Sequence, residues 1–378
     1  MKKRYGKLFA LLLAVVMVLS LVGCGTTPKP TGKVKIGISM PTKSLQRWIQ
    51  DGEYLVQEFE KAGFECDLQY AGDNVIAEQV AQIENMIAND CKVLVIVAID
   101  AKSLSGVLEA AIEKEIAVFA YDRLIVNTDA VTYYSTFDNV KVGAEQAKFI
   151  VKALDLDNAA GPFNIEIFTG DPADTNAFFF YKGAMDVMKP YIDAGKVKIL
   201  SGQVEQLQTA TDKWNAELAQ ARMEDLIASV GYGPTSGKKL DAVLCSNDST
   251  AQGAITALVA NGWDATNIPV ITGQDCDKPN VTFMLQGLQA VSIFKDTRTL
   301  AKQTVKMVVQ YLNGEKVDVN DTTTYNNGNK DIDSFLSDPV PCTVDEIISM
   351  LFDSGYYTWD DPKLAEAAKI AEALGIKK

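Results

Sequence analysis

Charged and amide side chains follow several of the apolar runs in this 378-residue chain. Asp122 and Arg123 come directly after AVFAY, and Asn247 comes directly after DAVLCS. Carboxylates, guanidinium groups and carboxamides make charge-assisted, often bidentate hydrogen bonds, which suit vicinal hydroxyls. The candidates found in this way are Lys43, Arg47, Trp48, Asp100, Asp122, Arg123, Asp171, Asp174, Asn176, Phe178, Phe179, Phe180, Asn247, Asp248, Asp275 and Lys295.

Aromatic residues stand among these polar groups, and an aromatic face can cover the apolar C–H face of a pyranose. The mixture therefore fits a sugar better than an amino acid, a peptide or a metal ion. No DxDxDG loop and no Cys/His set has metal-ligand spacing, so we expect no metal site and no cofactor. The run GYGPTSGKK at 231–239 lacks phosphate-loop spacing and predicts a turn.

Composition excludes several classes of protein. Histidine is absent, which removes Ser-His-Asp and Cys-His nucleophile sites and His-ligated zinc. The formal net charge of −13 argues against nucleic acid, whose affinity depends on Lys and Arg contacts to phosphates. A carboxylate-based enzyme remains possible at this point.

Apolar runs of six to eight residues alternate with amphipathic segments, which predicts βαβ units and buried parallel sheets. The expected strands are 34–40, 64–71, 92–99, 117–122, 131–138, 164–170, 197–202, 241–247, 269–275 and 290–296. The expected helices are 47–62, 75–89, 102–114, 140–155, 175–193, 211–229, 249–261, 297–312 and 361–374. Two such sets predict an α/β fold of two doubly wound lobes, and ligands bind beyond the carboxyl ends of such strands.

The N-terminus has the features of an export signal. A basic start precedes the apolar run 8–22, which is short for a membrane span, and the run ends at Leu-Val-Gly-Cys. This ending resembles a bacterial lipobox, in which Cys24 is lipidated after removal of residues 1–23. Residues 24–33 then form a lipid-anchored tether, and the body lies outside the cytoplasm, attached to the outer face of the membrane.

Five further cysteines cannot all pair, and none forms a CxxC motif. We interpret them as small core residues.

The segments IGISMPTKSLQRW, AYDRLI, GPFNIEIFTGDPADTNAFFF, VLCSNDSTAQGAI and FKDTRTLAK occur in order along the chain. With them the sequence resembles the type I periplasmic sugar-binding proteins of ABC importers, in the xylose-binding and multiple-sugar (galactose/glucose/arabinose) branch. The resemblance implies two lobes joined by a three-segment hinge, which close over one monosaccharide.

Carried over by position, the resemblance gives each candidate a role. Arg47 and Asp122 with Arg123 bind hydroxyls, and Trp48 provides a stacking ring. The full set of implied sugar-binding residues is Lys43, Arg47, Trp48, Asp122, Arg123, Asn176, Phe178, Phe180, Trp214, Asn247, Asp275 and Lys295, with Lys43 at the rim.

The lobes are expected at 34–138 plus 279–314 and at 139–278 plus 315–378, with hinge crossings near 137–140, 275–279 and 313–324. We expect a monomer that performs no chemistry and delivers its sugar to an ABC permease. A sensory protein that signals to a chemoreceptor or sensor kinase is the alternative. A glycosidase that uses Asp122, Asp171 and Asp174 is a more distant one.

Overall fold

The computed structural model describes residues 33–72 and 75–377. The expected signal peptide at 1–23, the lipidation site Cys24 and nearly all of the tether lie outside the described residues. The described residues from Lys35 onward form one unit, which carries all the described elements of secondary structure.

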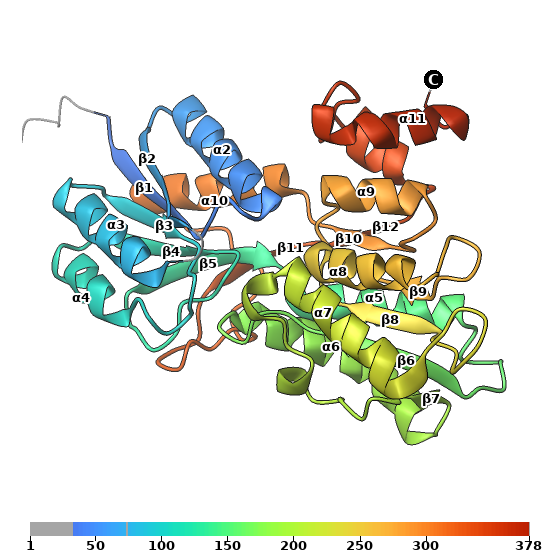
Figure 1. Cartoon of the computed structure of the whole chain (residues 1–378). Coiled ribbons are helices and arrows are strands. Elements are labelled where there is room, and N and C mark those ends of the chain that lie inside the picture. The colour runs from blue at the N-terminus through green and yellow to red at the C-terminus, as the bar shows by residue number, and fades with distance from the viewer. Residues whose placement is uncertain (1–32, 73–74, 378) are drawn as a thin grey trace, which may run out of the picture. The chain divides into compact units, whose positions relative to one another are not determined.

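Six parallel strands form the first sheet, in the order β11-β5-β4-β3-β1-β2 (Figure 1). Their bounds are β1 Lys35–Met40, β2 Glu65–Tyr70, β3 Val93–Ile96, β4 Ala117–Tyr121, β5 Val131–Phe137 and β11 Ser334–Ser337. Helices α2 (Gln46–Lys61) and α10 (Thr297–Leu312) pack on one face, and α3 (Ile76–Ala88) and α4 (Ser105–Glu113) pack on the other. We call this sheet with its helices the first lobe.

The second sheet has four parallel strands in the order β7-β6-β8-β9. They are β6 Phe163–Phe168, β7 Val197–Lys198, β8 Ala242–Cys245 and β9 Val270–Ile271. Its helices are α5 Asn139–Ala153, α6 Thr175–Asp193, α7 Ala216–Leu226, α8 Asp248–Ala260 and α9 Lys278–Leu285. An antiparallel pair, β10 (Ser292–Phe294) and β12 (Val340–Cys342), continues beside β9 through a bridge between Gln274 and Ile293. Together these elements form the second lobe.

Short helical turns and one C-terminal helix complete the described fold. They are η2 Gln206–Gln208, η3 Asp212–Trp214, η4 Ile227–Gly231, η5 Ile348–Asp353, η6 Pro362–Leu364 and α11 Ala365–Ala373. In Figure 1, α11 lies beside α9 at the edge of the second lobe.

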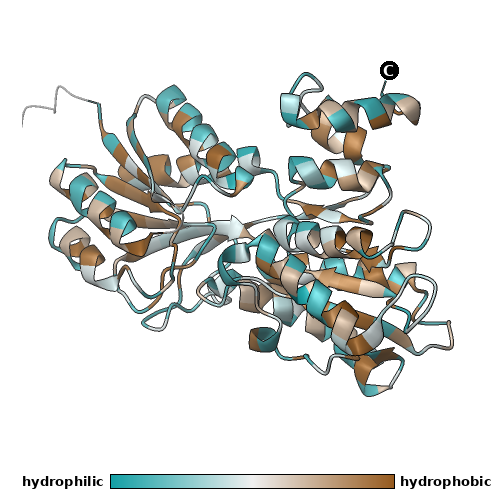
Figure 2. Ribbon diagram, viewed as in Figure 1, coloured by the Kyte–Doolittle hydropathy of each residue, from teal (hydrophilic) through white to brown (hydrophobic). Residues whose placement is uncertain are grey.

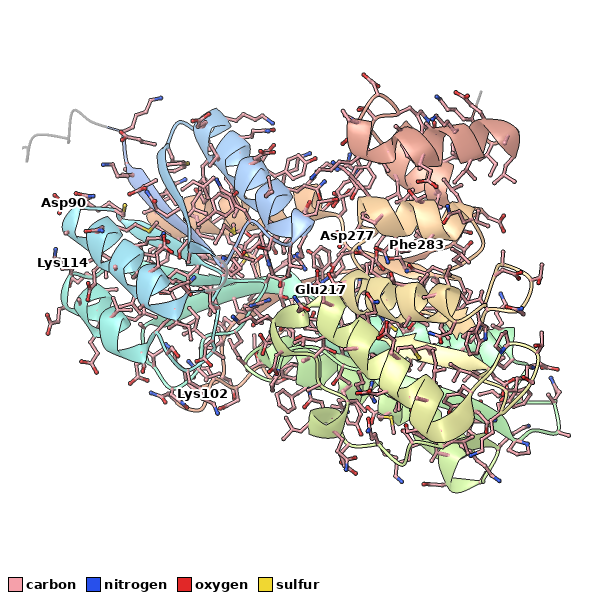
Figure 3. The ribbon with its side chains drawn as sticks, in the orientation of Figure 1. Asp90, Lys102, Lys114, Glu217, Asp277 and Phe283 are labelled. Carbon is pink, nitrogen blue, oxygen red and sulfur yellow. The ribbon has the colours of Figure 1, made fainter. Side chains whose placement is uncertain are left out.

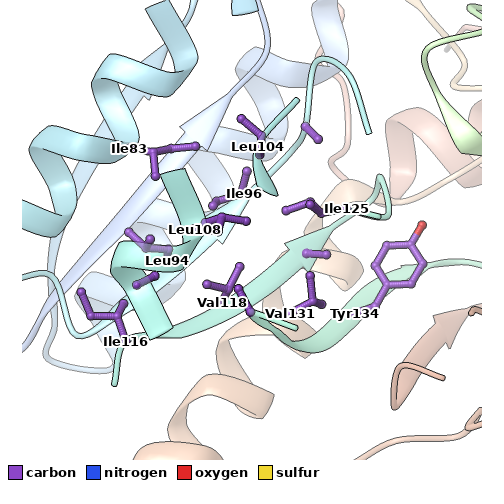
Figure 4. Packing of buried hydrophobic residues seen from close by; sticks show 14 of the residues in the cluster. Ile83, Leu94, Ile96, Leu104, Leu108, Ile116, Val118, Ile125, Val131 and Tyr134 are labelled. Carbon is purple, nitrogen blue, oxygen red and sulfur yellow. The ribbon is translucent and has the colours of Figure 1, made fainter. Parts of the chain in front are cut away.

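Burial of both sheet faces explains why the central strands of the first sheet are apolar along their whole length. Strands β3 (VLVI) and β4 (AVFAY) are buried at every position, as covered parallel strands must be. Figure 2 shows hydrophobic strands flanked by helices whose outward faces are hydrophilic. Figure 4 shows one resulting core, in which Ile83 of α3 and Leu108 of α4 pack over Leu94 and Val118 of the sheet. The expected α/β architecture is confirmed.

The hydrogen bonding places two segments in the lobe opposite to the one expected. β11 pairs in parallel with β5 and so belongs to the first sheet, whereas 315–378 was expected wholly in the second lobe. Helix α9 and strand β10, expected in the first lobe, pack in the second. The reason is edge pairing: β5 and β9 each present an open edge, and a distant strand satisfies it.

Within the described residues, the chain therefore crosses between the lobes at three places. These are Phe137 to Asn139, Phe294 to Thr297, and Ser337 to Val340. The first crossing agrees with the expected 137–140, and the expected crossings at 275–279 and 313–324 are wrong. Two crossings are tied together, since the Asp138 N–H donates to the Ser337 carbonyl at 3.0 Å.

Five cysteines in the described part of the chain carry free thiols: Cys66, Cys91, Cys245, Cys276 and Cys342. Four are buried and Cys66 is partly buried. Burial raises the pKa of Cys91 to about 11, which makes that thiol a poor nucleophile. Among the helices built from described residues, none is both long enough and apolar enough to cross a membrane.

Candidate functional site

A small cavity lies between the two lobes, beyond the carboxyl ends of their strands. It encloses about 390 Å³ of empty space, including its open mouth. This is near the lower limit for small-molecule pockets and suits one small ligand. The lining residues are Leu45, Arg47, Trp48, Asp122, Arg123, Asp174, Asn176, Phe180, Trp214, Asn247, Ser249, Gln274, Asp275, Asp277 and Lys295.

Arg47 stands in the first turn of α2 and is surrounded by carboxylates. Its guanidinium lies 2.7 Å from Asp122, 3.2 Å from Asp51 and 3.4 Å from Asp275. Burial alone would lower the pKa of Arg47, but these three carboxylates hold it well above its ordinary value. Because Asp275 belongs to the second lobe, Arg47 is an ion-pair bridge between the lobes.

The carboxylates around Arg47 differ in their own pKa values. Burial pushes the pKa of Asp122 up, but Arg47, Lys295 and Arg123 outweigh it, so this pKa lies below its ordinary value. Burial dominates at Asp51 and raises its pKa to about 6. Asp122 is therefore ionised at neutral pH and able to accept hydrogen bonds.

The backbone at Asp122 is held by bonds from both lobes. Its φ is +59°, a left-handed conformation that Asp and Asn tolerate better than most residues. Its carbonyl accepts hydrogen bonds from the Tyr134 hydroxyl at 2.6 Å, the Thr136 hydroxyl at 2.8 Å and Asn176 Nδ2 at 2.8 Å. Since Asn176 begins α6 of the second lobe, this bond also joins the two lobes.

A second ion pair crosses the cavity between Arg123 and Asp174. Arg123 Nε lies 2.9 Å from Asp174 Oδ2, and the same oxygen accepts from Trp214 Nε1 at 3.2 Å. The other carboxylate oxygen caps α6, accepting from the Asn176 N–H at 2.9 Å. Asp174 thus fixes the position of an arginine and an indole ring together.

Aromatic rings cover the charged groups. The guanidinium carbons of Arg47 and Arg123 lie 4.3 and 5.1 Å from the Trp48 ring centroid. The Lys295 ammonium lies 5.5 Å from the Phe180 ring centroid and 3.0 Å from Asp275. The cavity therefore combines desolvated charges with apolar ring faces.

Gly170 makes room for Trp214. A Cβ atom built at Gly170 would come within 1.9 to 2.2 Å of three Trp214 ring carbons, where any side chain would force the indole to move. A glycine after β6 is therefore required for this lining ring.

Several polar atoms on lining residues have no partner within the described part of the chain. Trp48 Nε1 and Gln274 Oε1 are buried without a hydrogen bond. Asn247 accepts through Oδ1 from the Thr250 N–H at 2.9 Å, and no described residue accepts from its amide nitrogen. Such groups cost stability when buried alone, which is the situation that a polar ligand relieves.

Asp277 occupies the N-cap position of α9 without a side-chain capping bond, and it lines both this cavity and a wider groove outside it. Figure 3 labels it in the region where the side chains of the two lobes meet. Its carboxylate makes no hydrogen bond or ion pair with the described residues. Burial and the neighbouring Asp275 raise its pKa to about 7, although Arg47, Lys295 and Lys278 oppose the shift.

Ten of the twelve residues expected to bind sugar line the cavity: Arg47, Trp48, Asp122, Arg123, Asn176, Phe180, Trp214, Asn247, Asp275 and Lys295. Lys43 does not; it lies over the Tyr70 ring at 4.8 Å, on the outer groove, which agrees with a place at the rim. Phe178 does not either, and it is 43% exposed because adjacent helix positions face different directions. Phe179 packs on Tyr325 of the segment before β11, at 4.8 Å between ring centroids.

The lining residues missing from the expected set are Leu45, Asp174, Ser249, Gln274 and Asp277. Asp174 was among the strand-end candidates but not in the sugar-binding set that the resemblance implied. Asp277 carried no comparable signal. No group of three or more His, Cys, Asp or Glu residues is arranged to hold a metal ion in the described ranges.

A periplasmic binding protein domain model matches residues 36–316 of the chain. The multiple sugar-binding periplasmic protein of Azospirillum brasilense is 46% identical over 345 residues, covering 89% of this chain and 94% of that protein. The D-xylose-binding periplasmic protein of Escherichia coli K12 is 35% identical, covering 86% of this chain and 91% of that protein. A crystal structure of a solute-binding protein from Clostridium phytofermentans with bound β-D-glucose is 53% identical, with a TM-score of 0.83, covering 87% of this chain and 99% of that one.

Proposed function

Because the chain belongs to the periplasmic binding protein family, whose members bind ligands without transforming them, we propose that it captures one monosaccharide in the cavity between its lobes. The ligand is an aldose of the glucose, galactose, xylose or arabinose type.

The observation that carries this proposal is the combination of charge pairs and ring faces around a small interlobe cavity. Arg47 with Asp122 and Arg123 with Asp174 present planar groups with several hydrogen-bonding atoms, which suit the vicinal hydroxyls of a sugar ring. Trp48, Phe180 and Trp214 offer faces for its C–H surface. An apolar ligand would leave the buried Trp48 Nε1 and Gln274 Oε1 without hydrogen bonds, which is costly.

The names of the relatives support the same ligand class. One relative is described as a multiple sugar-binding protein, another as a D-xylose-binding protein, and the related crystal structure contains β-D-glucose. Pentoses and hexoses differ by one CH₂OH group, so cavity volume decides between them.

Ligand binding stabilises the closed arrangement by linking the lobes. Arg47–Asp275, Arg123–Asp174 and the bond from Asn176 to Asp122 all cross between lobes around the cavity. A sugar that contacts groups of both lobes shifts the open–closed equilibrium toward closure.

The closed form is then recognised by the permease of an ABC importer, which receives the sugar. The protein acts as a monomer outside the cytoplasm, held at the membrane by a lipid on Cys24. A sensory partner would use the same closed form. Radiolabelled sugar uptake in a strain that lacks the gene distinguishes them, because only the importer role predicts lost uptake.

Tryptophan fluorescence tests the proposed site. Trp48 and Trp214 line the cavity, whereas Trp263 lies in the second-lobe core. Trp359 stacks on Phe352 with ring centroids 3.4 Å apart. Titration with glucose, galactose, xylose, arabinose and ribose should give a saturable change that Trp48→Phe diminishes and Trp359→Phe preserves. A response lost only in Trp359→Phe would place the ligand elsewhere.

A further inference from the structure

The C-terminal segment 343–377 lies beyond the residues matched by the family model and packs on the second lobe. Leu364, Ala367 and Ala371 are buried against α9, as the neighbouring positions of α9 and α11 in Figure 1 agree. Lys278 of α9 forms an ion pair with Asp361 at 2.5 Å. The segment is thus anchored to the helix that starts next to the cavity.

The side chain of Tyr357 reaches α2 of the first lobe. The Tyr357 hydroxyl accepts a hydrogen bond from Gln46 Nε2 at 2.6 Å and donates one to the Cys276 carbonyl at 2.9 Å. Gln46 Oε1 in turn accepts from the Lys278 N–H at 3.3 Å. The carboxamide of Gln46 is therefore held at both ends by groups outside its own lobe.

These bonds are one residue away from the cavity on each side. Gln46 precedes Arg47, and Cys276 follows Asp275, and these two neighbours form an ion pair across the lobes at 3.4 Å. Gln46 and Tyr357 themselves do not line the cavity. The bonds span the two lobes, because Gln46 belongs to α2 whereas Cys276 and Lys278 belong to the second lobe.

The base of Tyr357 is fixed near a crossing. Its neighbour Tyr356 packs on Phe294 with ring centroids 4.8 Å apart, and Arg298 donates to the Ser354 carbonyl at 2.8 Å. Tyr357 is 4% exposed. It is thus a buried side chain in a segment that contacts both lobes near a crossing, and its hydroxyl links α2 of the first lobe to the second lobe.

We propose that Tyr357 is a positioning residue that fastens Gln46, and with it Arg47, in the closed form and so prolongs the residence of the bound sugar. This inference rests on the proposed function and extends it to a residue that does not touch the ligand. The hydroxyl adds bonds after the lobes close, so it slows ligand release and leaves the encounter step unchanged.

Stopped-flow kinetics of Tyr357→Phe on the full mature chain test the inference. This variant keeps the packed ring and removes only the hydroxyl, leaving two partners unsatisfied in the closed form. The dissociation rate should rise about 5- to 20-fold, with an association rate within about twofold of wild type. An unchanged dissociation rate would overturn the inference.

Gln46→Ala tests the same link from the other lobe, at a half-buried position that tolerates change should Tyr357→Phe fail to fold. It should speed release of the sugar similarly. The double variant should release sugar no faster than the faster single variant, because both substitutions remove the same Gln46–Tyr357 hydrogen bond. Fully multiplicative effects would contradict the inference.

Tyr232→Phe is the matched control. Tyr232 is 5% exposed, and its hydroxyl donates to Glu166 at 2.6 Å within the second lobe. It should lower the melting temperature and leave sugar dissociation unchanged; equal acceleration in this control would show general loosening instead of a specific link. Wild-type protein that binds no sugar would refute the proposed function, whereas normal release by Tyr357→Phe refutes this inference alone.

Discussion

Replacing Asp122 by Asn is the sharpest test of the charged part of the site. The residue adopts φ +59°, which Asn tolerates, so the change removes a charge without straining the backbone. Its carbonyl bonds from Tyr134, Thr136 and Asn176 remain in place. What is lost is an ionised acceptor 2.7 Å from Arg47.

The size of the effect follows from these contacts. A hydrogen bond to a charged group is worth about 1.5–3 kcal/mol, so sugar affinity should fall roughly 10- to 150-fold. Stability should fall less than the 3–5 kcal/mol typical of a stranded buried charge, because Arg47 keeps Asp51 and Asp275. The variant therefore folds and can be measured.

Calorimetric titration of Asp122→Asn, with Asp51→Asn as its control, separates ligand contact from support. Asp51 is equally buried and also contacts Arg47, but it does not line the cavity. The control should lose stability and much less affinity. Wild-type affinity in folded Asp122→Asn, or equal losses in both variants, would refute the assignment of Asp122 as a ligand-binding residue.

Three further changes test the surroundings of the cavity. Gly170→Ala should displace the Trp214 ring and reduce sugar affinity at least tenfold by calorimetry, whereas retained affinity would show that the ring is dispensable. Phe180→Ala should weaken sugar binding by about 1–3 kcal/mol, whereas Phe178→Ala, at an exposed position, should leave the affinity unchanged. Weaker binding by Phe178→Ala alone would show that Phe178, and not Phe180, contacts the sugar. Asp277 has a raised folded-state pKa of about 7 against an ordinary 3.8, so its contribution to stability is present below about pH 4 and lost as pH rises through 7. Asp277→Asn should therefore melt at a higher temperature than wild type at pH 8 and lose most of that advantage by pH 5, and parallel melting curves across this range would contradict the shift.

The strand ends were predictable because they depend on local pattern. Apolar runs bounded by helices indicate where a strand stops, so Asp122 after β4 and Lys295 after β10 follow from that position. Asp275 lies beyond β9, which ends at Ile271 and is shorter than the expected strand 269–275. The convergence of these residues on one cavity follows from the doubly wound topology. The resemblance added Trp214, which no strand end marks.

Long-range pairing explains what was missed. β11 has four residues and does not directly follow a helix, so no local pattern indicates that it completes the first sheet beside β5. Phe178 was misplaced because three consecutive rings on one helix give no indication of which one faces the cavity. Tyr357 reaches Gln46 across 311 positions, a contact that a single sequence cannot reveal.

The central claim is that this cavity binds one aldose, and isothermal titration calorimetry of the mature chain with D-glucose and D-xylose tests it most directly. We expect one site per chain with micromolar or tighter affinity, about −8 kcal/mol or better, for at least one of the two sugars. The claim would be contradicted if neither sugar produced measurable heat or displaced a competing ligand, in protein shown to be folded and free of bound ligand.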